Sequence, residues 1–319
     1  MTAAAESGAV TVRPMVEQDL DEVNRIARVA FGTFLGLPEP EHFMGDADLI
    51  RTRWRANPAA AVVAEADGRI VGSNFAANWG SVGFFGPLTV EPAVWDRAIG
   101  RRLLDATMEL FAGWGTAHVG LFTFAQSAKH VGLYQRYGFW PRYLTGIFTA
   151  PATPAEPDGA IHLSELSPAD RVTAVKAAEA LADAIHPGLD VTLDIEAVDR
   201  QRLGDTVVLH DASGVCGLAI CHVGAGTEAG GGNCYIKFGG VRPGPDAERD
   251  FRRLVRACHA LAAERGATVL VAGMNAGRDR AWRVLEDMGF RRDMQGVTMH
   301  RPNEPGYSTS DAFIIDDWR

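Results

Sequence analysis

The chain has 319 residues, enough for two domains of ordinary size, and 47% of them are hydrophobic, so each half can bury a sizeable core. Its 31 basic and 40 acidic residues give a formal net charge of −9, which is not the basic balance typical of nucleic-acid-binding proteins, and no run of about 18 apolar residues predicts a membrane span. The first residues lack the basic and apolar segments of a signal peptide, and the four cysteines lack zinc-site spacing, so we expect a cytoplasmic protein.

The hydrophobic pattern of the first half predicts a hairpin-rich α/β order. The dipeptide Asp67-Gly68 is typical of a hairpin turn, and the apolar residues from Ile99 to Trp114 recur at helical spacing. In chain order we expect a strand at 10–14, a helix at 17–31, strands at 61–66, 69–77 and 82–90, a helix from about 98, a strand at 118–124, a helix at 127–137 and a strand at 140–149. This order favours a mixed sheet over a strictly parallel one.

Landmarks of the first half recur in the second half at a constant spacing. Val90-Glu91-Pro92 returns as Val241-Arg242-Pro243, and Gly138-Phe139 returns as Gly289-Phe290, both with an offset of 151 residues. The stretch between the halves contains three prolines within seven residues, which neither a helix nor a central strand accommodates. We therefore expect two copies of one fold, with an N-terminal domain at 1–150, a linker at 151–159 and a C-terminal domain at 160–319.

The segment from Trp95 to Arg101 is a candidate anion site. A strand, a short loop and a helix that begins near Ala98 follow one another, and the start of a helix offers unpaired N–H groups and partial positive charge. Small side chains at Ala98 and Gly100 let a phosphate approach the backbone, and the guanidinium groups of Arg97 and Arg101 can add charge-assisted hydrogen bonds. The alternative is an ordinary strand–loop–helix connection with solvated arginines.

A second motif follows the strand at 118–124. Ser127 is a candidate N-cap, and the following helix carries Leu133 and Tyr134 before Gly138-Phe139. Together the two segments resemble the GNAT superfamily of acetyl-CoA-dependent N-acetyltransferases, over residues 10–149 and more weakly over 160–319. The chain departs from the family pattern at four positions, where Trp95, Ala98, Ser127 and His130 replace Gln or Arg, Gly, Asn and Ala.

The resemblance implies a mixed, mostly antiparallel sheet in each copy, flanked by helices and splayed between the strands at 82–90 and 118–124. Acetyl-CoA would lie in this V-shaped gap, and the expected cofactor-binding residues are Leu88, Thr89, Val90, Trp95, Arg97, Ala98, Ile99, Gly100, Arg101, Ser127 and His130. No metal is implied.

The resemblance also implies a mechanism. A primary amine would attack the thioester directly, a backbone N–H near Leu88 to Val90 would stabilise the oxyanion, and Tyr134 would protonate the leaving thiolate. Glu65, Glu91, His118 and a water chain are candidates for removing the amine proton, and no signature singles one out.

The offset of 151 residues predicts that the cofactor site of the second copy is degenerate. It places Arg249, Phe251 and Leu285 where the first copy has Ala98, Gly100 and Tyr134. A phenylalanine blocks the approach of a phosphate, and a leucine cannot donate a proton. The second copy is then left to shape the substrate pocket, to stabilise the first copy or to form a dimer.

Two further stretches carry weaker signals. The glycine-rich stretch 224–232 lacks the sequence of a nucleotide loop and is interpreted as a flexible hairpin tip. The acidic tail with Asp311, Asp316 and Asp317 beside Trp318 is interpreted as a solvated last strand, with attraction of a cationic substrate as the alternative.

Three functions stay open: a catalytic N-acetyltransferase, a non-catalytic acyl-CoA-binding or sensing module, and a duplicated scaffold. The acidic balance slightly favours a cationic small-molecule amine as the partner, with no nucleic acid and no membrane. The acceptor, the acyl length and the oligomeric state, including a homodimer, are left undetermined.

Overall fold

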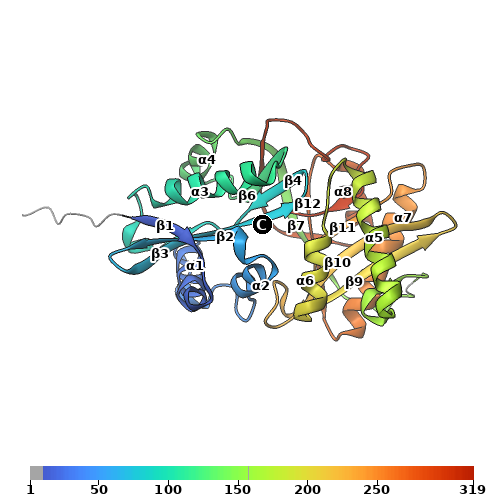
Figure 1. Cartoon of the computed structure of the whole chain (residues 1–319). Coiled ribbons are helices and arrows are strands. Elements are labelled where there is room, and N and C mark those ends of the chain that lie inside the picture. The colour runs from blue at the N-terminus through green and yellow to red at the C-terminus, as the bar shows by residue number, and fades with distance from the viewer. Residues whose placement is uncertain (1–9, 157) are drawn as a thin grey trace, which may run out of the picture.

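One continuous sheet runs through both halves of the chain. The computed structural model describes residues 10–156 and 158–319. Its strands lie in the order β1-β2-β3-β4-β6-β13-β7-β12-β11-β10-β9-β8, with β5 paired to β3 and β14 paired to β11. Two lobes, one from each half of the sequence, share this sheet, and the C-terminus lies between them (Figure 1).

The first half alternates short strands with helices that each bury one apolar face. Its strands are β1 (Thr11–Pro14), β2 (Ala61–Ala66), β3 (Arg69–Trp79), β4 (Val82–Phe85), β5 (Thr89–Val90), β6 (His118–Thr123) and β7 (Trp140–Pro151). Its helices are α1 (Leu20–Phe34), α2 (Leu49–Ala56), α3 (Ile99–Trp114) and α4 (Ala128–Gln135), with short 3-10 turns at Glu17–Asp19, Pro40–His42, Pro58–Ala60 and Pro92–Val94. In α3, for example, Ile99, Leu103 and Phe111 are buried on one side.

The second half follows the same alternation. Its strands are β8 (Ile161–His162), β9 (Gly204–Asp211), β10 (Gly214–Gly224), β11 (Gly230–Val241), β12 (Val269–Asn275), β13 (Arg291–Arg301) and β14 (Ile314–Ile315). Its helices are α5 (Pro168–Ile185), α6 (Thr192–Gln201), α7 (Ala247–Glu264) and α8 (Asp279–Asp287), with a 3-10 turn at Leu163–Glu165.

The two halves exchange their β7 and β13 strands. Strand β13, from the second half, lies between β6 and β7 of the first, and pairs antiparallel with both. Strand β7 in turn pairs with β12 of the second half, with Ile147 opposite Gly273. Each of these two strands follows a short helix, α4 or α8, and each extends the sheet of the other half. The lobes are therefore joined by backbone hydrogen bonds as well as by side chains.

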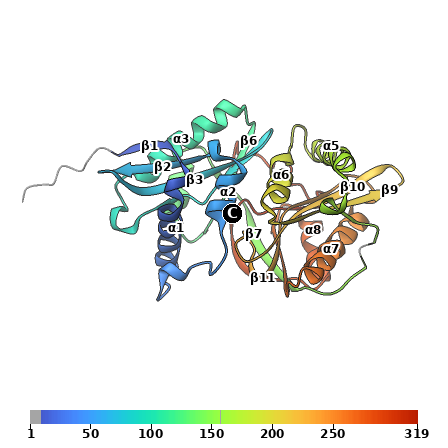
Figure 2. The same cartoon turned by 60° about the horizontal axis from the view of Figure 1, so that its bottom comes forward.

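Helices cover both faces of the shared sheet. In the first half α3 and α4 lie on one face and α1 on the other, and in the second half α5 and α6 lie opposite α7 and α8 (Figures 1 and 2). Separate apolar clusters form under these layers, including one beneath α7 and α8 and another beneath α3 and α4. The mostly antiparallel mixed sheet flanked by helices confirms the predicted fold class, with parallel pairing between β4 and β6 and between β11 and β12.

The expected elements match the structure closely, with two differences. The strand expected at 82–90 is divided into β4 and β5, because the chain leaves the sheet at residues 86–88. Helix α2 was not expected; its eight residues have a polar composition with only two buried side chains, Ile50 and Thr52, so the hydrophobic pattern is weak. The domain limits at 150 and 160 stay predictions, and the expected linker begins inside β7.

Two interpretations of surface segments were wrong. The tail is not solvated: Asp316, Asp317 and Trp318 are each at most 3% exposed. The carboxylate of Asp316 pairs with the guanidinium of buried Arg278 at 2.9 Å, which compensates its burial. The stretch 224–232 does form the expected hairpin tip between β10 and β11, but the tip is not free, because the amide N–H of Gly231 donates to Asp46 of the first half at 2.7 Å.

Three further expectations concern the opening residues, membrane spans and the cysteines. The opening residues on which the signal-peptide prediction rests lie outside the described part of the chain. Among the described residues, no helix combines the length and the apolar character needed to cross a bilayer. All four cysteines are buried and free.

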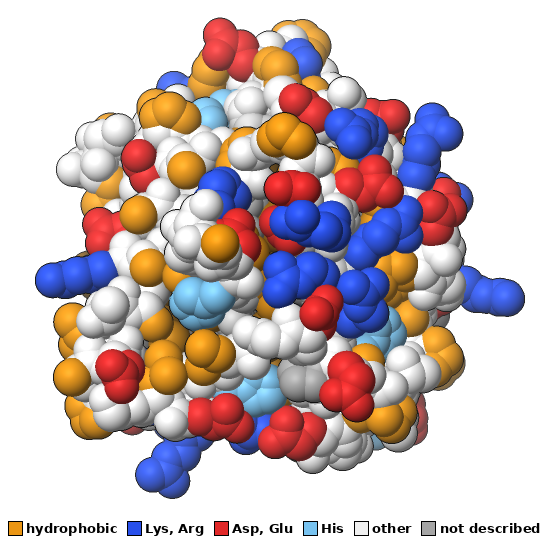
Figure 3. Space-filling model, turned by 90° about the vertical axis from the view of Figure 1, so that its right-hand side faces the viewer, with side chains coloured by type: hydrophobic (Ala, Val, Ile, Leu, Met, Phe, Trp, Pro, Cys, Tyr) orange, Lys and Arg blue, Asp and Glu red, His pale blue; other side chains and the backbone are white. Residues whose placement is uncertain are grey.

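Basic and acidic side chains are interleaved at the outer end of the second half (Figure 3). Helix α7 lies toward that end, and four of its arginines each form an ion pair with a nearby acidic group: Arg249 with Asp246, Arg252 with Glu248, and both Arg253 and Arg256 with Asp158. The positive charge of this helix is thus compensated locally.

Candidate active site

The sheet opens into a gap between β5 and β6. Strands β4 and β6 pair in parallel only from Val82 to Phe84. Phe85 lies opposite Ala76 of β3, and Thr89 lies opposite Ser73. The step from Phe85 to Thr89 is four residues but the step along β3 is three, so the segment between β4 and β5 contains one extra residue, a β-bulge. Strand β5 has no pairing with β6, and the first half therefore has a splayed edge at residues 86–90.

One backbone N–H at this edge faces the gap. The amide N–H of Glu91 donates to the carbonyl oxygen of Val71 on β3 at 2.9 Å. Because successive amides of a strand point to opposite edges, the N–H of Val90 points away from β3. The carbonyl of Val90 faces the same way and accepts the indole N–H of Trp95 at 2.7 Å. The bulged strand thus presents polar backbone toward β6.

A cavity of about 1080 Å³ occupies the gap. Eleven of the twelve residues predicted for the site line it: Leu88, Thr89, Val90, Trp95, Ala98, Ile99, Gly100, Arg101, Ser127, His130 and Tyr134. The twelfth, Arg97, is exposed and does not line the cavity. The fold therefore brings together two segments that are about thirty residues apart in the sequence.

The start of α3 provides unpaired donors at the cavity wall. The amides of Arg101 and Arg102 bond to the carbonyl of Ala98, whereas those of Ile99 and Gly100 have no acceptor within the described residues. Ala98 itself has a φ of 60°, the left-handed conformation that glycine adopts more readily. The alanine therefore makes the turn that the resemblance assigns to a glycine, at a cost of about 1–2 kcal/mol.

Gly100 leaves room beside these donors. A Cβ atom at this position would meet only the side-chain ends of Leu133 and Leu88, both at 3.7 Å, which is ordinary contact. A methyl group would fit there, and a longer side chain would extend into the cavity.

The loop before α3 is held by Trp95. Besides the hydrogen bond of its indole to Val90, the ring lies 5.8 Å from the ammonium of Lys129. Lys129 also pairs with Asp96 at 2.7 Å, but both groups are largely exposed, so this pair adds little stability. Trp95 links the loop before α3 to the start of α4.

The start of α4 lies next to this loop and also lines the cavity. The hydroxyl of Ser127 accepts the amide N–H of His130 at 3.4 Å, which confirms Ser127 as the N-cap. The imidazole of His130 packs against the ring of Phe34, 5.2 Å between centroids. Burial and the neighbouring Lys129 lower its pKa, so this histidine is neutral at physiological pH.

Tyr134 is buried at the cavity wall. It is 7% exposed and its ring packs edge-to-face on Phe85, with 5.7 Å between centroids. Its hydroxyl has no hydrogen-bond partner among the described residues. Burial raises its pKa above the ordinary value, so the phenol stays protonated at neutral pH and is available as a donor.

The second half supplies the opposite wall of the cavity, one of the three roles that the sequence left open for it, although the residues of this wall were not predicted. Beside Thr149, on strand β7 of the first half, this wall is lined by residues of the second half: Glu228, Ala229, Gly230, Gly231, Asn233, Tyr235, Val271, Met294, Trp318 and Arg319. Phe31, Phe34 and Phe43 add aromatic side chains from the first half. Single aromatic residues on α1 carry no sequence signal, and Glu228 lay in the stretch interpreted as a flexible tip.

A buried charge network fixes this wall to the first half. The carboxylate of Glu228 pairs with Arg53 at 2.6 Å and with Lys237 at 2.7 Å. Burial alone would raise the pKa of Glu228, but the charges of Arg53 and Lys237 hold it well below its usual range. Arg53 also donates to the carbonyl oxygen of Gly86 at 2.6 Å, next to the bulge. The bulged segment is therefore tied to both halves.

None of the side chains considered for removing the amine proton lines the cavity. Glu65 pairs with Arg13 and Glu91 with Arg25. His118 is buried next to His300, with 3.0 Å between ring nitrogens, and burial lowers its pKa to about 4. Among the candidates from the sequence, a water chain is the one that remains.

The corresponding region of the second half has no such gap. Strand β11 stays paired with β10 on both sides of a bulge at Lys237, and β14 pairs with it at Gly239 and Gly240, which the offset of 151 residues relates to Leu88 and Thr89. Phe251, which corresponds to Gly100, is fully buried and packs against Phe313, with 5.5 Å between ring centroids. Chain and side chains fill the space that is open in the first half.

The comparison with known families agrees with this geometry. Residues 21–139 match the acetyltransferase (GNAT) family, a segment that runs from α1 to the end of the α4 motif. The matched segment lies entirely in the first half. No curated protein matches the chain significantly.

Solved structures with a similar fold span the whole chain. A putative acetyltransferase from Pyrococcus horikoshii has a TM-score of 0.69 at 14% identity, over 99% of this chain and 97% of that one. A GCN5-related N-acetyltransferase from Sphaerobacter thermophilus gives 0.60 at 18% identity, over 94% and 98%. The glucosamine N-acetyltransferase region of a fungal multi-domain β-N-acetylglucosaminidase gives 0.62 at 15% identity, over 94% of this chain and 39% of that one. At these identities the similarity concerns the fold alone.

Proposed function

We propose that the chain transfers an acetyl group from acetyl-CoA to a primary amine in the cavity of the first half. One observation carries the proposal: the bulged edge at Leu88–Val90, the unpaired N–H groups at the start of α3 and the hydroxyl of Tyr134 all face one cavity. These are the three kinds of group that a thioester, its diphosphate and its leaving thiolate require.

The residues present suit acetyl-CoA as the co-substrate. The amides of Ile99 and Gly100 and the guanidinium of Arg101 would bind the diphosphate, with Arg97 nearby on the outer side and Ala98 forming the turn. Leu88, Thr89 and Val90 would align the extended pantetheine arm along the open edge. Trp95, Ser127 and His130 would form the remaining walls. No metal takes part in this scheme.

The reaction needs one nucleophile and two proton transfers. The amine nitrogen attacks the thioester carbon, and the N–H of Val90 stabilises the negative charge on its oxygen. The C–S bond then breaks while Tyr134 donates its proton to the sulfur. The attacking nitrogen passes its proton to water, because no titratable side chain from the sequence candidates reaches the cavity.

The acceptor is proposed to be a small-molecule amine that enters from the side of the second half. Aromatic rings from α1 and the wall around Glu228 and Tyr235 make this side partly apolar and partly charged. A panel of amines should include glucosamine, since a glucosamine N-acetyltransferase region shares the fold. A cytoplasmic location, the lack of nucleic-acid and membrane partners and a homodimer stay proposals.

The second half is proposed to be a second copy of the fold with a degenerate cofactor site. Three observations support this: the exchange of β7 and β13, the continuous β11 with β14 beside it, and the buried Phe251 and Leu285. In this view the second copy serves as a wall of the acceptor pocket and as part of the shared sheet.

Calorimetric titration with acetyl-CoA tests the proposal. We expect one site per chain, at least about 100-fold weaker in Gly100→Glu, where a carboxylate would face the diphosphate. Gly100→Ala is the matched control and should bind nearly as well, since its methyl group has room. Two sites per chain would contradict the degenerate second copy, and no binding would favour a scaffold.

A non-catalytic acyl-CoA-binding module is the second candidate. The replacements at Trp95 and Ala98 favour it, because they alter the loop that holds the diphosphate in the family pattern. It predicts acetyl-CoA binding without turnover on any amine, whereas the acetyltransferase proposal predicts both.

A further inference from the structure

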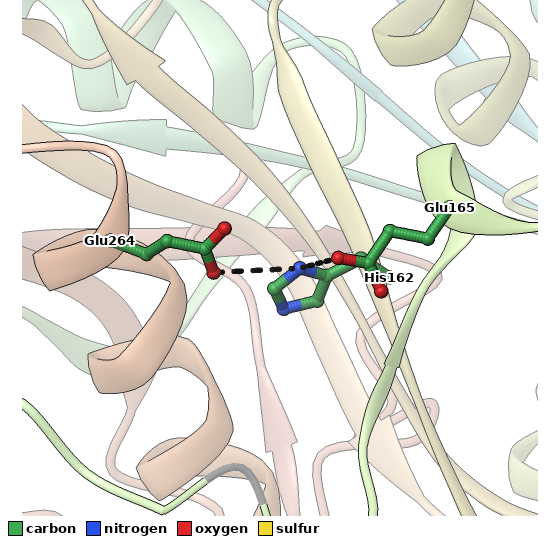
Figure 4. Close-up of side chains that lie close together, drawn as sticks. All are labelled: His162, Glu165 and Glu264. Carbon is green, nitrogen blue, oxygen red and sulfur yellow. Dashed lines mark ion pairs between the residues drawn. The ribbon is translucent and has the colours of Figure 1, made fainter.

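A buried histidine nitrogen without a partner lies at the far edge of the second half. His162, on β8, is 7% exposed, and its Nδ1 atom is fully buried without a hydrogen bond to any described residue. A buried polar atom of this kind costs free energy unless a ligand or ion satisfies it. The nitrogen points between two carboxylates, from Glu165 and Glu264 (Figure 4).

These two carboxylates have no lysine or arginine partner among the described residues. Neither Glu165 nor Glu264 lies within ion-pair distance of a lysine or arginine among the described residues. The nearby cation, Arg265, instead pairs with Asp205 at 2.9 Å. Glu264 is also the last residue of α7, where the helix dipole adds partial negative charge. The cluster thus has an excess of negative charge next to an unpaired nitrogen.

The geometry is close to that of a metal site. The Nδ1 atom of His162 lies 3.7 Å from Oε1 of Glu165 and 3.9 Å from Oε2 of Glu264, and the three atoms lie within 4.8 Å of one another. Two ligands of one tetrahedral zinc ion lie about 3.3–3.4 Å apart at bond lengths of about 2.0–2.1 Å. Both glutamates are more than half exposed, so each can move by the required half ångström or so.

A second group of metal-ligating side chains is already neutralised by arginines. Asp211, Cys216 and Asp250 also lie close together. Asp211, however, pairs with Arg242 at 2.9 Å, and Asp250 pairs with Arg253 at 3.1 Å. This group has no missing positive charge, and we assign no ion to it.

We propose that His162, Glu165 and Glu264 bind a divalent transition-metal cation of the Zn²⁺ class. An imidazole nitrogen favours such a metal over Mg²⁺ or Ca²⁺, which prefer oxygen ligands alone. Three protein ligands leave a coordination position for water, from the shallow depression beside Ala260 and Ala263. The ion would bridge the segment that enters the second half and the end of α7, far from the cavity of the first half.

Metal titration of the full-length protein tests the proposal. Protein stripped with a chelator should take up one Zn²⁺ per chain in competition with a chromophoric chelator, and Zn²⁺ should raise the midpoint of thermal unfolding. Glu165→Gln and Glu264→Gln remove one ligand each at exposed positions, so they should fold normally. Each should weaken Zn²⁺ binding by about 10- to 100-fold or more.

The controls distinguish this site from others. Glu179→Gln, an exposed glutamate of α5 outside the cluster, should bind Zn²⁺ like the wild type. Co²⁺ should give a spectrum without the thiolate charge-transfer band that ligation by Cys216 would produce. The proposal fails if no Zn²⁺ binds, if binding survives both glutamate substitutions, if it is lost in Cys216→Ala, or if Mg²⁺ binds equally well.

Discussion

Each half contains a parallel pair of strands, β4 and β6 in the first half and β11 and β12 in the second. The space beside these strands is open in the first half and filled in the second. In the first half one bulged residue separates β5 from β6, and the small Gly100 leaves a cavity of about 1080 Å³. In the second half β11 also carries one extra residue, Lys237, against β10, but β14 lies along its edge and Phe251 fills the position. Because both strands carry a bulge, the pairing of the strand edge and a few side chains decide whether this fold forms a binding site or a solid core.

The largest expected effect is on turnover and concerns the hydroxyl group of Tyr134. Tyr134→Phe removes the proposed proton donor and should lower kcat by about 10²–10⁴-fold while leaving acetyl-CoA affinity nearly unchanged. Steady-state kinetics and calorimetry measure the two quantities. Tyr137→Phe is the matched control, because that hydroxyl donates to Asp105 at 2.7 Å and does not line the cavity. Equal turnover in the Tyr134 variant would remove its assigned role.

Removing an aromatic ring from the filled region of the second half should destabilise the protein without opening a second acetyl-CoA site. Phe313→Ala removes a buried ring that packs on Phe251 and should cost about 3–5 kcal/mol of unfolding free energy. Denaturant unfolding measures the loss, and Phe31→Ala, at the partly exposed cavity wall, should cost much less. Acetyl-CoA stoichiometry should stay at one, since Phe251 still blocks the cleft. A second equivalent bound would show that the ring of Phe313, and not Phe251, closes the cleft.

Disrupting the buried charge network between the halves should lower the free energy of unfolding by almost as much. Glu228→Gln leaves Arg53 and Lys237 buried without their shared carboxylate and should cost about 3–5 kcal/mol. Glu109→Gln, an exposed residue of α3, should change stability by less than about 0.5 kcal/mol.

The contribution of this network to folding stability depends on pH. Because the pKa of Glu228 is lowered by folding, its contribution is complete above the pKa of about 4.3 in the unfolded chain and is lost as the pH falls below it. The stability difference between wild type and Glu228→Gln should shrink only below about pH 4.5. A difference that changes between pH 6 and 8 would contradict this assignment.

The smallest effect on stability is expected for the buried histidine pair where the exchanged strand β13 lies beside β6. Burial lowers the pKa of His118 to about 4 and that of His300 to about 3, so the unfolded chain binds protons that the folded protein does not. Stability from this pair is complete above about pH 6.5 and declines as the pH falls toward 4. The difference between wild type and His118→Gln/His300→Gln should fall by about 2–3 kcal/mol between pH 7.5 and 5.5. A constant difference would show that the pair titrates normally.

Local patterns were enough to predict most of the elements and the first wall of the cavity. The turn at Asp67-Gly68, the apolar spacing in α3 and the N-cap at Ser127 depend on neighbours in sequence, and all three agree with the structure. The cavity-lining position of Tyr134 followed from the resemblance of its motif.

The second wall depends on contacts between distant residues. Arg53 and Glu228 are 175 residues apart, and neither side chain carries a signal of its own. The acidic tail was misinterpreted for the same reason, because the burial of Asp316 depends on its pairing with Arg278. The strand exchange is also non-local, since a regular hydrophobic strand does not encode which neighbour it joins.

The strand exchange has a consequence for how the chain is made. The first half lacks a neighbour between β6 and β7 until β13 emerges, and 140 residues separate Pro151 from Arg291. At a synthesis rate of about 5–20 residues per second, this delay is about 7–28 s. During that time β6 and β7 expose hydrogen-bonding edges that other nascent chains can join. The half with the candidate active site is thus the first to be synthesised and among the last to be finished.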